Sequence, residues 1–490
     1  MYFTERTIVH TLPFSRSLFF FLTPLSKTMF IKPFKTHLTI FQQEGYSVTR
    51  FFTWWLSHPV TFTISSKKPL DLTPKARLLT LLSYTSFAAL FLFLLVLKQI
   101  PLTIILMLSF FFTPYLYLFL AITLITPYEK INRKKTIKQI NTLIRSYHHL
   151  SVIGVTGSFG KTSVKDFLYS ILTSYQQTVK TPESYNTIFG IAKVVKMEIF
   201  QKTRRFICEM GAYTRGEIAE ICHMVDPQYA ILTSVGSQHL ERFKTLENTT
   251  LAKFELVDVV QPQNALVNLD NPLIKAHLTL PQYRKVKTYS LTDPKADFFV
   301  EKYTLTPKGI RFRLVYRGKP LDFVSPLFGT SNLYNLVAAI SMSLLLKVPL
   351  EKIKGSVASL KPSPHRLDLK RINRATLIDN AFSSNEEGFT AILNDLKNLK
   401  GKKVLLTPGI IELGPKMASV HQKLGQLAAP VFDHIILVGQ SERTKNFEIG
   451  VGNTQKISYL NNATNLWPII QDLSKKYDWI LLENDLPDNC

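Results

Sequence analysis

The chain has 490 residues, of which 46% are hydrophobic, 12% aromatic and 19% charged. This composition excludes a disordered or fibrous protein, and the length suits about three domains. Lys and Arg outnumber Asp and Glu by 59 to 35, a formal charge of +24, which favours an anionic partner: a nucleotide, a membrane surface or nucleic acid. The three cysteines are too few for a disulfide framework and have no zinc-ligand spacing.

Residues 1–77 form a basic N-terminal segment, cytoplasmic or interfacial. Its apolar run at 19–25 is too short to cross a membrane and has no small-residue cleavage site after it, so we do not interpret it as a signal peptide. Residues 42–55 fit either an interfacial helix with an aromatic anchor or a helix packed on the soluble body. Met29 is an alternative start of the protein.

Two uncharged apolar stretches follow, at 78–97 and 102–125, with Lys98 in the short connector. About 20 apolar residues suffice for a membrane-spanning helix, so the sequence predicts a two-helix transmembrane hairpin over 78–126. A buried helical hairpin is the alternative. Basic residues precede the first stretch and fill the juxtamembrane linker at 127–150. The positive-inside rule then puts the catalytic domains on the cytoplasmic face of the cell membrane, with lysines near anionic lipids.

From residue 151 onward, short β-rich runs alternate with helical stretches, which predicts an α/β fold with parallel sheets. The predicted strands lie at 152–155, 206–208, 230–234, 265–268, 376–379, 404–407, 435–438 and 479–482. The predicted helices lie at 161–174, 247–260, 333–346 and 386–399. Residues 297–324 alternate like an antiparallel edge hairpin. The Pro-rich run at 361–364 separates a central domain, 151–360, from a C-terminal domain, 361–490.

The strongest chemical signal is the glycine-rich turn at residues 154–163, G-V-T-G-S-F-G-K-T-S, between a predicted strand and a predicted helix. Glycines let the backbone wrap a phosphate, so that N–H groups and the helix N-terminus face the anion. Lys161 can reach the β and γ phosphates, and the Thr162 hydroxyl can bind Mg²⁺. Glu209 ends a predicted strand, where α/β proteins bind ligands. It is a candidate ligand of the same Mg²⁺ as Thr162, and the alternative is an ordinary surface glutamate.

The spacing of this turn, with glycines at 154, 157 and 160, resembles that of the Mur ligase family. Further motifs of the family are matched in order by F-I-C-E-M-G-A at 206–212, T-S-V-G-S-Q-H-L-E at 233–241, A-K-F-E-L at 252–256 and G-T-S-N-L-Y-N-L-V-A-A at 329–339. P-H-R-L at 364–367, L-I-D-N-A-F at 377–382 and G-I-I-E-L-G at 409–414 extend the likeness, most of all to the branch that adds D-alanyl-D-alanine.

The resemblance implies a P-loop-type central domain, a Rossmann-like C-terminal domain and an ATP- and Mg²⁺-dependent ligase. Such an enzyme activates a carboxylate as an acyl phosphate, which an amine then attacks. It implies catalytic roles for Lys161, Lys253 and His239, with Lys253 a metal ligand if carbamylated and His239 a ligand of a second Mg²⁺. The other implied residues are Thr156, Gly157, Ser158, Gly160, Thr162, Ser163, Asn332, Asn335, Arg366 and Asp379 for ATP, and Ser184, Asn186 and Thr187 for the sugar-nucleotide substrate.

The family's N-terminal uridine-nucleotide domain has no match here, and the predicted membrane hairpin stands in its place. This predicts a membrane-anchored ligase whose substrates are a nucleotide, an amino acid or peptide, and a soluble or lipid-linked precursor. Asn380 and Phe382, together with W-I-L-L-E-N-D-L-P-D at 479–488, depart from the family pattern near the expected amine site. A membrane-tethered P-loop ATPase that drives transport or assembly is the alternative function, and a catalytically dead scaffold is a third. Nucleic-acid binding is not expected, because the basic residues cluster at the membrane flanks. The oligomeric state is left open.

Overall fold

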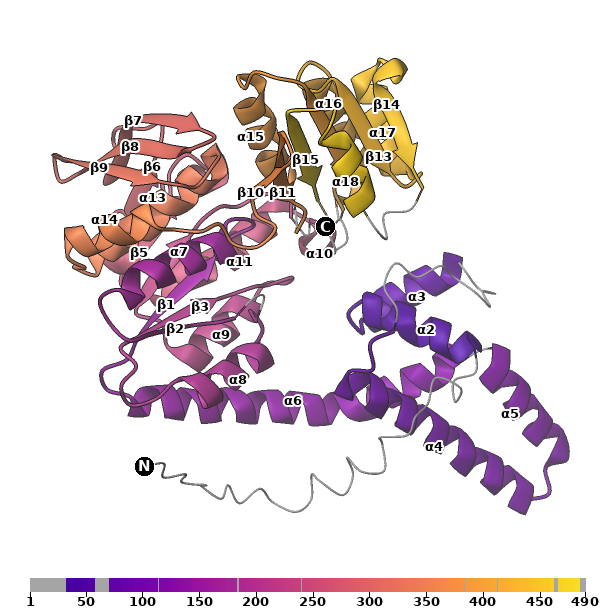
Figure 1. Ribbon diagram of the computed structural model, residues 1–490. Coiled ribbons are helices and arrows are strands. Elements are labelled where there is room, and N and C mark those ends of the chain that lie inside the picture. The colour runs from indigo at the N-terminus through magenta and orange to yellow at the C-terminus, as the bar shows by residue number, and fades with distance from the viewer. Residues whose placement is uncertain are drawn as a thin grey trace, which may run out of the picture. The chain divides into compact units, whose positions relative to one another are not determined.

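The computed structural model describes residues 32–57, 70–112, 114–182, 185–238, 240–382, 384–411, 413–461 and 466–484 (Figure 1). The chain divides into two units, Met1–Lys134 and Lys135–Cys490. The predictions on the apolar run at 19–25 and on Met29 concern residues outside this described set.

The first unit is helical, and its core is rich in aromatic residues. Its helices are α2 (Lys32–Gln43), α3 (Val48–Ser57), α4 (Pro74–Val96), α5 (Ile100–Phe112) and the first part of α6 (Pro114–Ser146). Gly45 and Tyr46 both have positive φ and separate α2 from α3. The stretch predicted as one helix at 42–55 is therefore a turn followed by a shorter helix.

The predicted membrane hairpin is realised only in part. Among the described residues, α4 is the one helix that by itself is long and apolar enough to cross a membrane. The second predicted span, 102–125, is not one helix, because α5 and α6 meet at an angle of 86° and count as one span only if taken together. Pro114 is the first residue of α6; proline has no N–H to donate and is favoured at the start of a new helix.

The predicted juxtamembrane linker at 127–150 is mostly helix, because α6 continues to Ser146. Its last turns belong to the second unit, where Ile137, Ile140 and Ile144 join a buried core. The Asn141 amide donates to the His223 carbonyl at 2.7 Å, which fixes the end of α6 within the second unit.

The second unit begins with a nine-stranded sheet in the order β2-β3-β1-β4-β5-β6-β7-β8-β9. The pairings from β2 to β7 are parallel, and β7, β8 and β9 are antiparallel. The predicted edge hairpin at 297–324 is thus a three-stranded meander. The strands are β1 (Ser151–Thr156), β2 (Thr178–Lys180), β3 (Arg205–Glu209), β4 (Tyr229–Leu232), β5 (Ala265–Asn268), β6 (Lys287–Ser290), β7 (Phe298–Thr306), β8 (Gly309–Tyr316) and β9 (Lys319–Ser325).

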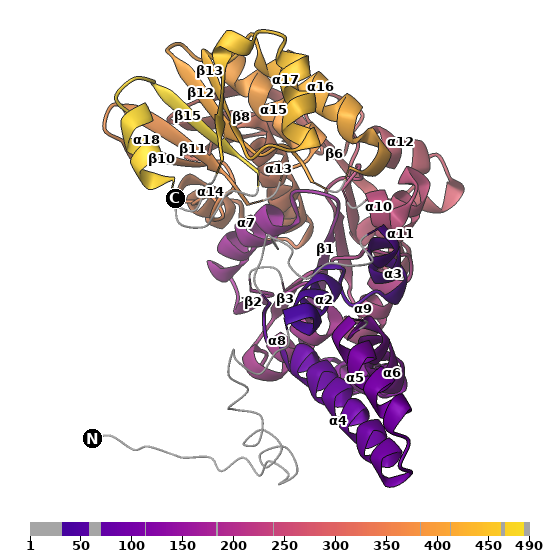
Figure 2. The same cartoon turned by 90° about the vertical axis from the view of Figure 1, so that its right-hand side faces the viewer.

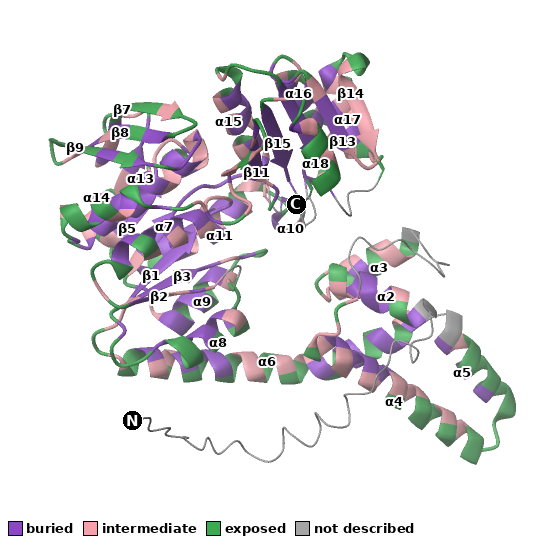
Figure 3. Ribbon diagram, viewed as in Figure 1, coloured by how far each residue is buried: buried purple, intermediate pink, exposed green. Residues whose placement is uncertain are grey.

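Helices cover both faces of this sheet, because successive strand residues point to opposite sides. On β1, Val152 joins the core with α8, α9 and α11, whereas Ile153 joins the core with α7, α13 and α14. Figure 3 shows the strands buried between these layers. The helices are α7 (Lys161–Thr173), α8 (Ile188–Glu198), α9 (Glu217–Val225), α10 (Leu240–Phe243), α11 (Leu246–Val259), α12 (Pro272–His277), α13 (Thr330–Leu345) and α14 (Leu350–Ala358).

A second, six-stranded sheet follows the 361–364 run, in the order β10-β11-β15-β12-β13-β14, with only the β10–β11 pairing antiparallel. This is the predicted Rossmann-like arrangement of parallel strands and helices. Its strands are β10 (Asp368–Ile372), β11 (Ala375–Asn380), β12 (Lys403–Thr407), β13 (His434–Val438), β14 (Ile457–Leu460) and β15 (Trp479–Glu483). Its helices are α15 (Glu386–Lys397), α16 (Met417–Ala428), α17 (Glu442–Val451) and α18 (Trp467–Leu473), and Figure 2 shows the sheet from the side.

Candidate active site

The glycine-rich turn connects β1 to α7, and two of its glycines are required by geometry. Gly157 has a φ of +147° and Gly160 a φ of +82°. A Cβ atom at Gly157 would overlap the Thr233 hydroxyl, and one at Gly160 would lie 2.5 Å from Asn335 Oδ1. The loop is therefore a tight cradle that only glycine can build.

The cradle presents the start of α7 as its anion-binding surface. The Ser158 N–H donates to the Ser234 carbonyl and the Phe159 N–H to the Ser234 hydroxyl, both at 2.9 Å, which fixes the loop. Gly160 is the N-cap of α7 and provides no side-chain cap. The first N–H groups of a helix lack intrahelical partners, so these donors are available to bind a phosphate.

Two of the predicted loop residues serve the loop itself. The Thr156 hydroxyl, fully buried, donates to the Met210 carbonyl at 2.9 Å, and the Ser158 hydroxyl accepts from the Gly236 N–H at 2.9 Å. Lys161 folds back over the loop and donates to the carbonyls of Gly157 at 2.6 Å and Ser158 at 3.2 Å. Burial lowers the pKa of Lys161 to about 8, although the charge of Glu209 opposes this shift.

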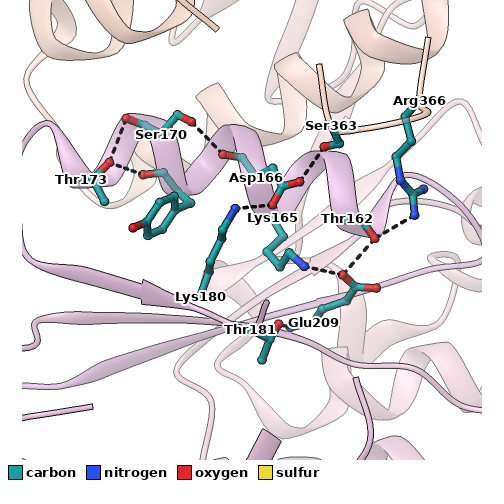
Figure 4. Close-up of polar contacts among 11 residues, drawn as sticks. Thr162, Lys165, Asp166, Ser170, Thr173, Lys180, Thr181, Glu209, Ser363 and Arg366 are labelled. Atoms are coloured by element: carbon teal, nitrogen blue, oxygen red, sulfur yellow. Dashed lines mark hydrogen bonds and ion pairs between the residues drawn. The ribbon is translucent and has the colours of Figure 1, made fainter. Parts of the chain in front are cut away.

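Thr162, Lys165, Glu209 and Arg366 converge beside the loop (Figure 4). The Thr162 hydroxyl donates to Glu209 Oε2 at 3.0 Å, and Arg366 Nη2 donates to Thr162 Oγ1 at 3.2 Å. Lys165 Nζ lies 3.0 Å from the same carboxylate oxygen, and both side chains of this ion pair are buried. Arg366 comes from the segment after the Pro-rich run, so both sheet domains of the second unit contribute to this site.

Sequence reasoning missed Lys165. The signal was available, because Lys165 lies three residues after Thr162 on α7 and therefore on the same face of the helix. No group of three or more His, Cys, Asp or Glu residues that could hold a metal occurs within the described ranges. A hydroxyl and one carboxylate fit Mg²⁺, which takes few protein ligands and completes its shell with phosphates and water.

Lys253 is the third predicted catalytic residue, and it lies on α11 with 3% of its surface exposed. Its Nζ lies 5.5 Å from the centre of the Phe243 ring. Burial, and secondarily the charge of Lys161, lowers the pKa of Lys253 to about 7. A lysine must be neutral to react with carbon dioxide, so this environment suits the predicted carbamate. His239 lies outside the described residues.

A cavity of about 270 Å³ adjoins the glycine loop and fits the predicted nucleotide site. Both predicted asparagines, Asn332 and Asn335, line it, as their three-residue spacing requires. Asn332 also donates to the Phe328 carbonyl at 2.9 Å. The cavity is further lined by Gly160, Ser163 and Arg366, which were predicted for ATP, and by Thr233, Asn268, Asp270, Asn271, Tyr334, Asn380, Ser384, Asn385 and Glu387, which were not.

Asp379 does not line this cavity. Its buried carboxylate contacts His365 Nδ1 at 2.9 Å and Lys370 Nζ at 2.8 Å, both within the C-terminal domain. The next residue, Asn380, faces the cavity instead, because successive strand residues point to opposite faces. The resemblance implies that Asp379 reaches the nucleotide when the two lobes close, and that role stays a prediction.

Of the predicted substrate residues, Asn186 and Thr187 are described and Ser184 lies outside the described residues. The Gly211 N–H donates to the Asn186 carbonyl at 3.1 Å, and Thr187 is the N-cap of α8. Thr181, just before this loop, accepts from the Glu209 N–H at 3.0 Å. The loop therefore lies against the strand end that carries Glu209.

Comparison with known proteins gives a consistent result. Residues 155–343 match the Mur ligase middle domain. The UDP-N-acetylmuramoyl-tripeptide–D-alanyl-D-alanine ligase of Escherichia coli strain K12 is 30% identical over 308 residues, 61% of this chain and 67% of that protein. The ligase of the same name from Bacillus subtilis is 25% identical over 343 residues, 68% of this chain and 72% of that protein. A crystal structure of MurF from Acinetobacter baumannii has a TM-score of 0.64 at 25% identity, covering 72% of this chain and 77% of that one.

Proposed function

The chain belongs to the Mur ligase family, and we propose on this premise that it joins an amino acid or short peptide to a peptidoglycan precursor at a membrane surface. It is an ATP-dependent carbon–nitrogen ligase that uses ATP and Mg²⁺, close to the MurF branch and to peptidoglycan precursor synthesis. The observation that carries the proposal is the convergence of Thr162, Glu209 and Arg366 at the glycine loop.

The residues present fit a magnesium nucleotide. The N–H groups at the start of α7, with Lys161, would hold the phosphates, and Asn332 and Asn335 would hold the base. Thr162 and Glu209 would bind Mg²⁺, which neutralises phosphate charge. Lys253 would supply an anionic ligand after carbamylation.

The chain's own residues meet the main electrostatic demand of the reaction. A carboxylate and a γ-phosphoryl group are both anionic, so their approach needs positive charge fixed in advance. Lys161, which lies over the glycine loop, and Arg366, which contacts Thr162, would provide it. In the reaction a carboxylate oxygen bonds to the γ-phosphorus as ADP leaves. The amine nitrogen then bonds to the carbonyl carbon, loses a proton and releases phosphate.

Membrane attachment would come from the first unit. The second half of α4 and most of α5 expose large apolar side chains, among them Leu92, Phe93, Ile104 and Ile105 at 53–60% exposure. Exposed apolar surface of this extent indicates contact with a partner or a membrane. We propose a hairpin of two passes that keeps the catalytic domains on the cytoplasmic face, and that a lipid-linked precursor is the favoured acceptor because it resides in that membrane.

The decisive experiment supplies the purified full-length chain with ATP, Mg²⁺ and candidate amines including D-alanyl-D-alanine. One arm contains the soluble UDP-linked tripeptide and the other a lipid-linked precursor in vesicles, with products identified by mass spectrometry. We expect amide product in both arms and faster turnover of the lipid-linked one. Equal turnover of the soluble precursor would rule out the lipid preference and leave the ligase activity standing.

The same assay separates a ligase from a membrane-tethered ATPase. A ligase releases ADP only when both a carboxylate and an amine acceptor are present. Steady ADP release without an amine would favour the ATPase, and it would overturn the amide-forming proposal.

A further inference from the structure

We propose that the first half of α6, residues 114–131, lies flat in the boundary between lipid headgroups and acyl chains. This inference rests on the membrane attachment proposed above and goes beyond it. In this arrangement the second half of the predicted second span is a helix that lies parallel to the membrane plane, with one face in contact with lipid.

The exposure pattern of α6 has the helical period that such a helix requires. Leu116, Phe119, Leu120 and Leu124 are 45–57% exposed and fall on one face. The opposite face packs into the core of the first unit through Tyr117, Leu118, Ala121, Ile122 and Ile125, all at most 8% exposed. Both faces are apolar, so the two differ in exposure and not in polarity. One face is covered by protein, and the other is left for lipid.

The bend between α5 and α6 is 86°, and three polar contacts hold the base of the hairpin against α6. The Ser83 hydroxyl donates to the Tyr117 carbonyl at 3.2 Å, and the Ser109 and Tyr117 hydroxyls lie 2.7 Å apart. Lys75 Nζ lies 2.9 Å from the Glu129 carboxylate, which connects the start of α4 to α6. If α5 enters the bilayer along its normal, α6 lies parallel to the surface.

The helix lengths agree with this arrangement. α5 has 13 residues, so it extends about 20 Å at 1.5 Å per residue, which is less than the ~30 Å hydrocarbon core. An α5 that starts at the near boundary therefore ends about 10 Å short of the far one. The connector at 97–99 and the long side chain of Lys98 have to bridge this remaining distance to the far headgroups.

The charge along α6 supports lipid as the occupant of the exposed face. Beyond Tyr128 the same face continues with Lys130 and Lys134, both exposed. Lysines at headgroup depth are attracted to anionic phospholipid, by about 1 kcal/mol each. This face is therefore apolar at 116–124 and basic at Lys130 and Lys134, and the long lysine side chains can extend to the headgroups while the helix axis stays in the plane.

Nitroxide depth measurements can test this orientation. Single labels are attached to L116C, L120C or L124C in the full-length chain, with Cys490→Ser, and the protein is reconstituted into vesicles of phosphatidylethanolamine and phosphatidylglycerol. Cys208 and Cys222 are buried and stay unlabelled. Depth is read from the relative accessibility to oxygen and to a water-soluble nickel complex. Labels at L92C and I104C on the hairpin are the deep reference, and ligase turnover verifies folding.

If the helix lies flat, the three labels have the same depth to within one or two helical rises of about 1.5 Å. All three then lie nearer to the headgroups than the reference labels at L92C and I104C. If the helix lies along the bilayer normal, the depths of the three labels differ by up to about 12 Å, at 1.5 Å per residue. That result would overturn the inference, and binding of the protein to the vesicles would still support membrane attachment. Spin coupling between labels on two copies, together with low accessibility of the labels to oxygen, would show that a second copy covers the exposed face of α6. That result would also overturn the inference. If the protein does not bind the vesicles, the attachment itself is wrong.

Discussion

Two buried glutamates end parallel strands in the ligase body, and their surroundings are electrostatically opposite. Glu209 is the last residue of β3, and Lys165 Nζ lies 3.0 Å from its carboxylate. Glu483 is the last residue of β15, and its partners are neutral: the Asn380 amide donates to it at 2.8 Å and the Ser384 hydroxyl also donates to it. Burial therefore raises the pKa of Glu483 to about 7.

The difference shows that a strand end provides the location of a polar site but not its chemistry. A cation in the core keeps Glu209 in an ion pair beside Thr162, where a carboxylate oxygen can serve as a metal ligand. With only neutral donors, Glu483 changes charge near neutral pH. It is hydrogen-bonded to Asn380 and Ser384, which line the cavity beside the glycine loop, so its protonation affects the hydrogen bonding of that wall.

The sharpest way to break the comparison is to remove the ion pair of Glu209. Glu209→Gln leaves the fully buried Lys165 ammonium without this carboxylate, so we expect unfolding free energy to fall by about 3–5 kcal/mol. Ligase turnover should also be lost, because the amide cannot replace a carboxylate as a metal ligand. Chemical denaturation and product formation measure the two effects.

The matched control is Lys165→Met, alone and combined with Glu209→Gln. The single variant should be destabilised to a similar extent, whereas the double variant should regain most of the stability and none of the turnover. If either single variant is as stable as the unchanged protein, the ion pair is not formed.

Lys161 tests whether the Glu209 site serves phosphate binding. Lys161→Ala should lower kcat by about 10²–10³-fold, the usual loss when one pre-positioned charge donor is removed, with little change in stability. Lys180→Ala is the control, because Lys180 contacts Asp166 on α7 at 2.7 Å and not the loop. Equal losses in the two variants would argue against a specific role for Lys161.

The glycine loop, β1 and α7 could be predicted from the sequence because their signals are local: glycines at 154, 157 and 160 lie between a β-rich run and a helical stretch. The short strands β2 and β6 were missed, since three or four residues carry too little periodicity. The sequence did not indicate that Asn380, rather than Asp379, lines the cavity beside the glycine loop, because a strand shows alternation but not which face meets a partner domain. Lys165 was missed because its importance depends on Glu209, 44 positions away.

For Glu483 the comparison can be sharpened through pH. A carboxyl group whose folded pKa is raised from 4.5 to about 7 stabilises the protein below pH 4.5 and loses that contribution as pH rises through 7. The unchanged protein should therefore lose about 2–3 kcal/mol of stability relative to Glu483→Gln between pH 4.5 and pH 8. Using the difference between the two proteins cancels the constant cost of the amide.

Denaturation curves at several pH values give this difference directly. We expect it to change mainly between pH 5 and pH 7 and to level off above pH 8. A difference that is independent of pH would mean that Glu483 is ionised in the folded protein throughout this range, and that its neutral partners suffice to hold the charge.

Lys253 provides the cationic counterpart of Glu483, a buried charge whose pKa moves toward neutrality, in this case down to about 7. The neutral amine, the form that reacts with carbon dioxide, should make up about 10% of Lys253 at pH 6 and about 90% at pH 8. Incubation with ¹³C-bicarbonate should therefore give a carbamate NMR signal that is up to about ninefold stronger at pH 8 than at pH 6. Ligase activity that is lost on removal of carbon dioxide should return when bicarbonate is added, and the recovery at pH 8 should exceed that at pH 6 by the same factor. Lys253→Met should give no signal at either pH. A signal that persists in this variant, or one of equal strength at both pH values, would assign the carbamate to another group and leave Lys253 an ordinary buried lysine.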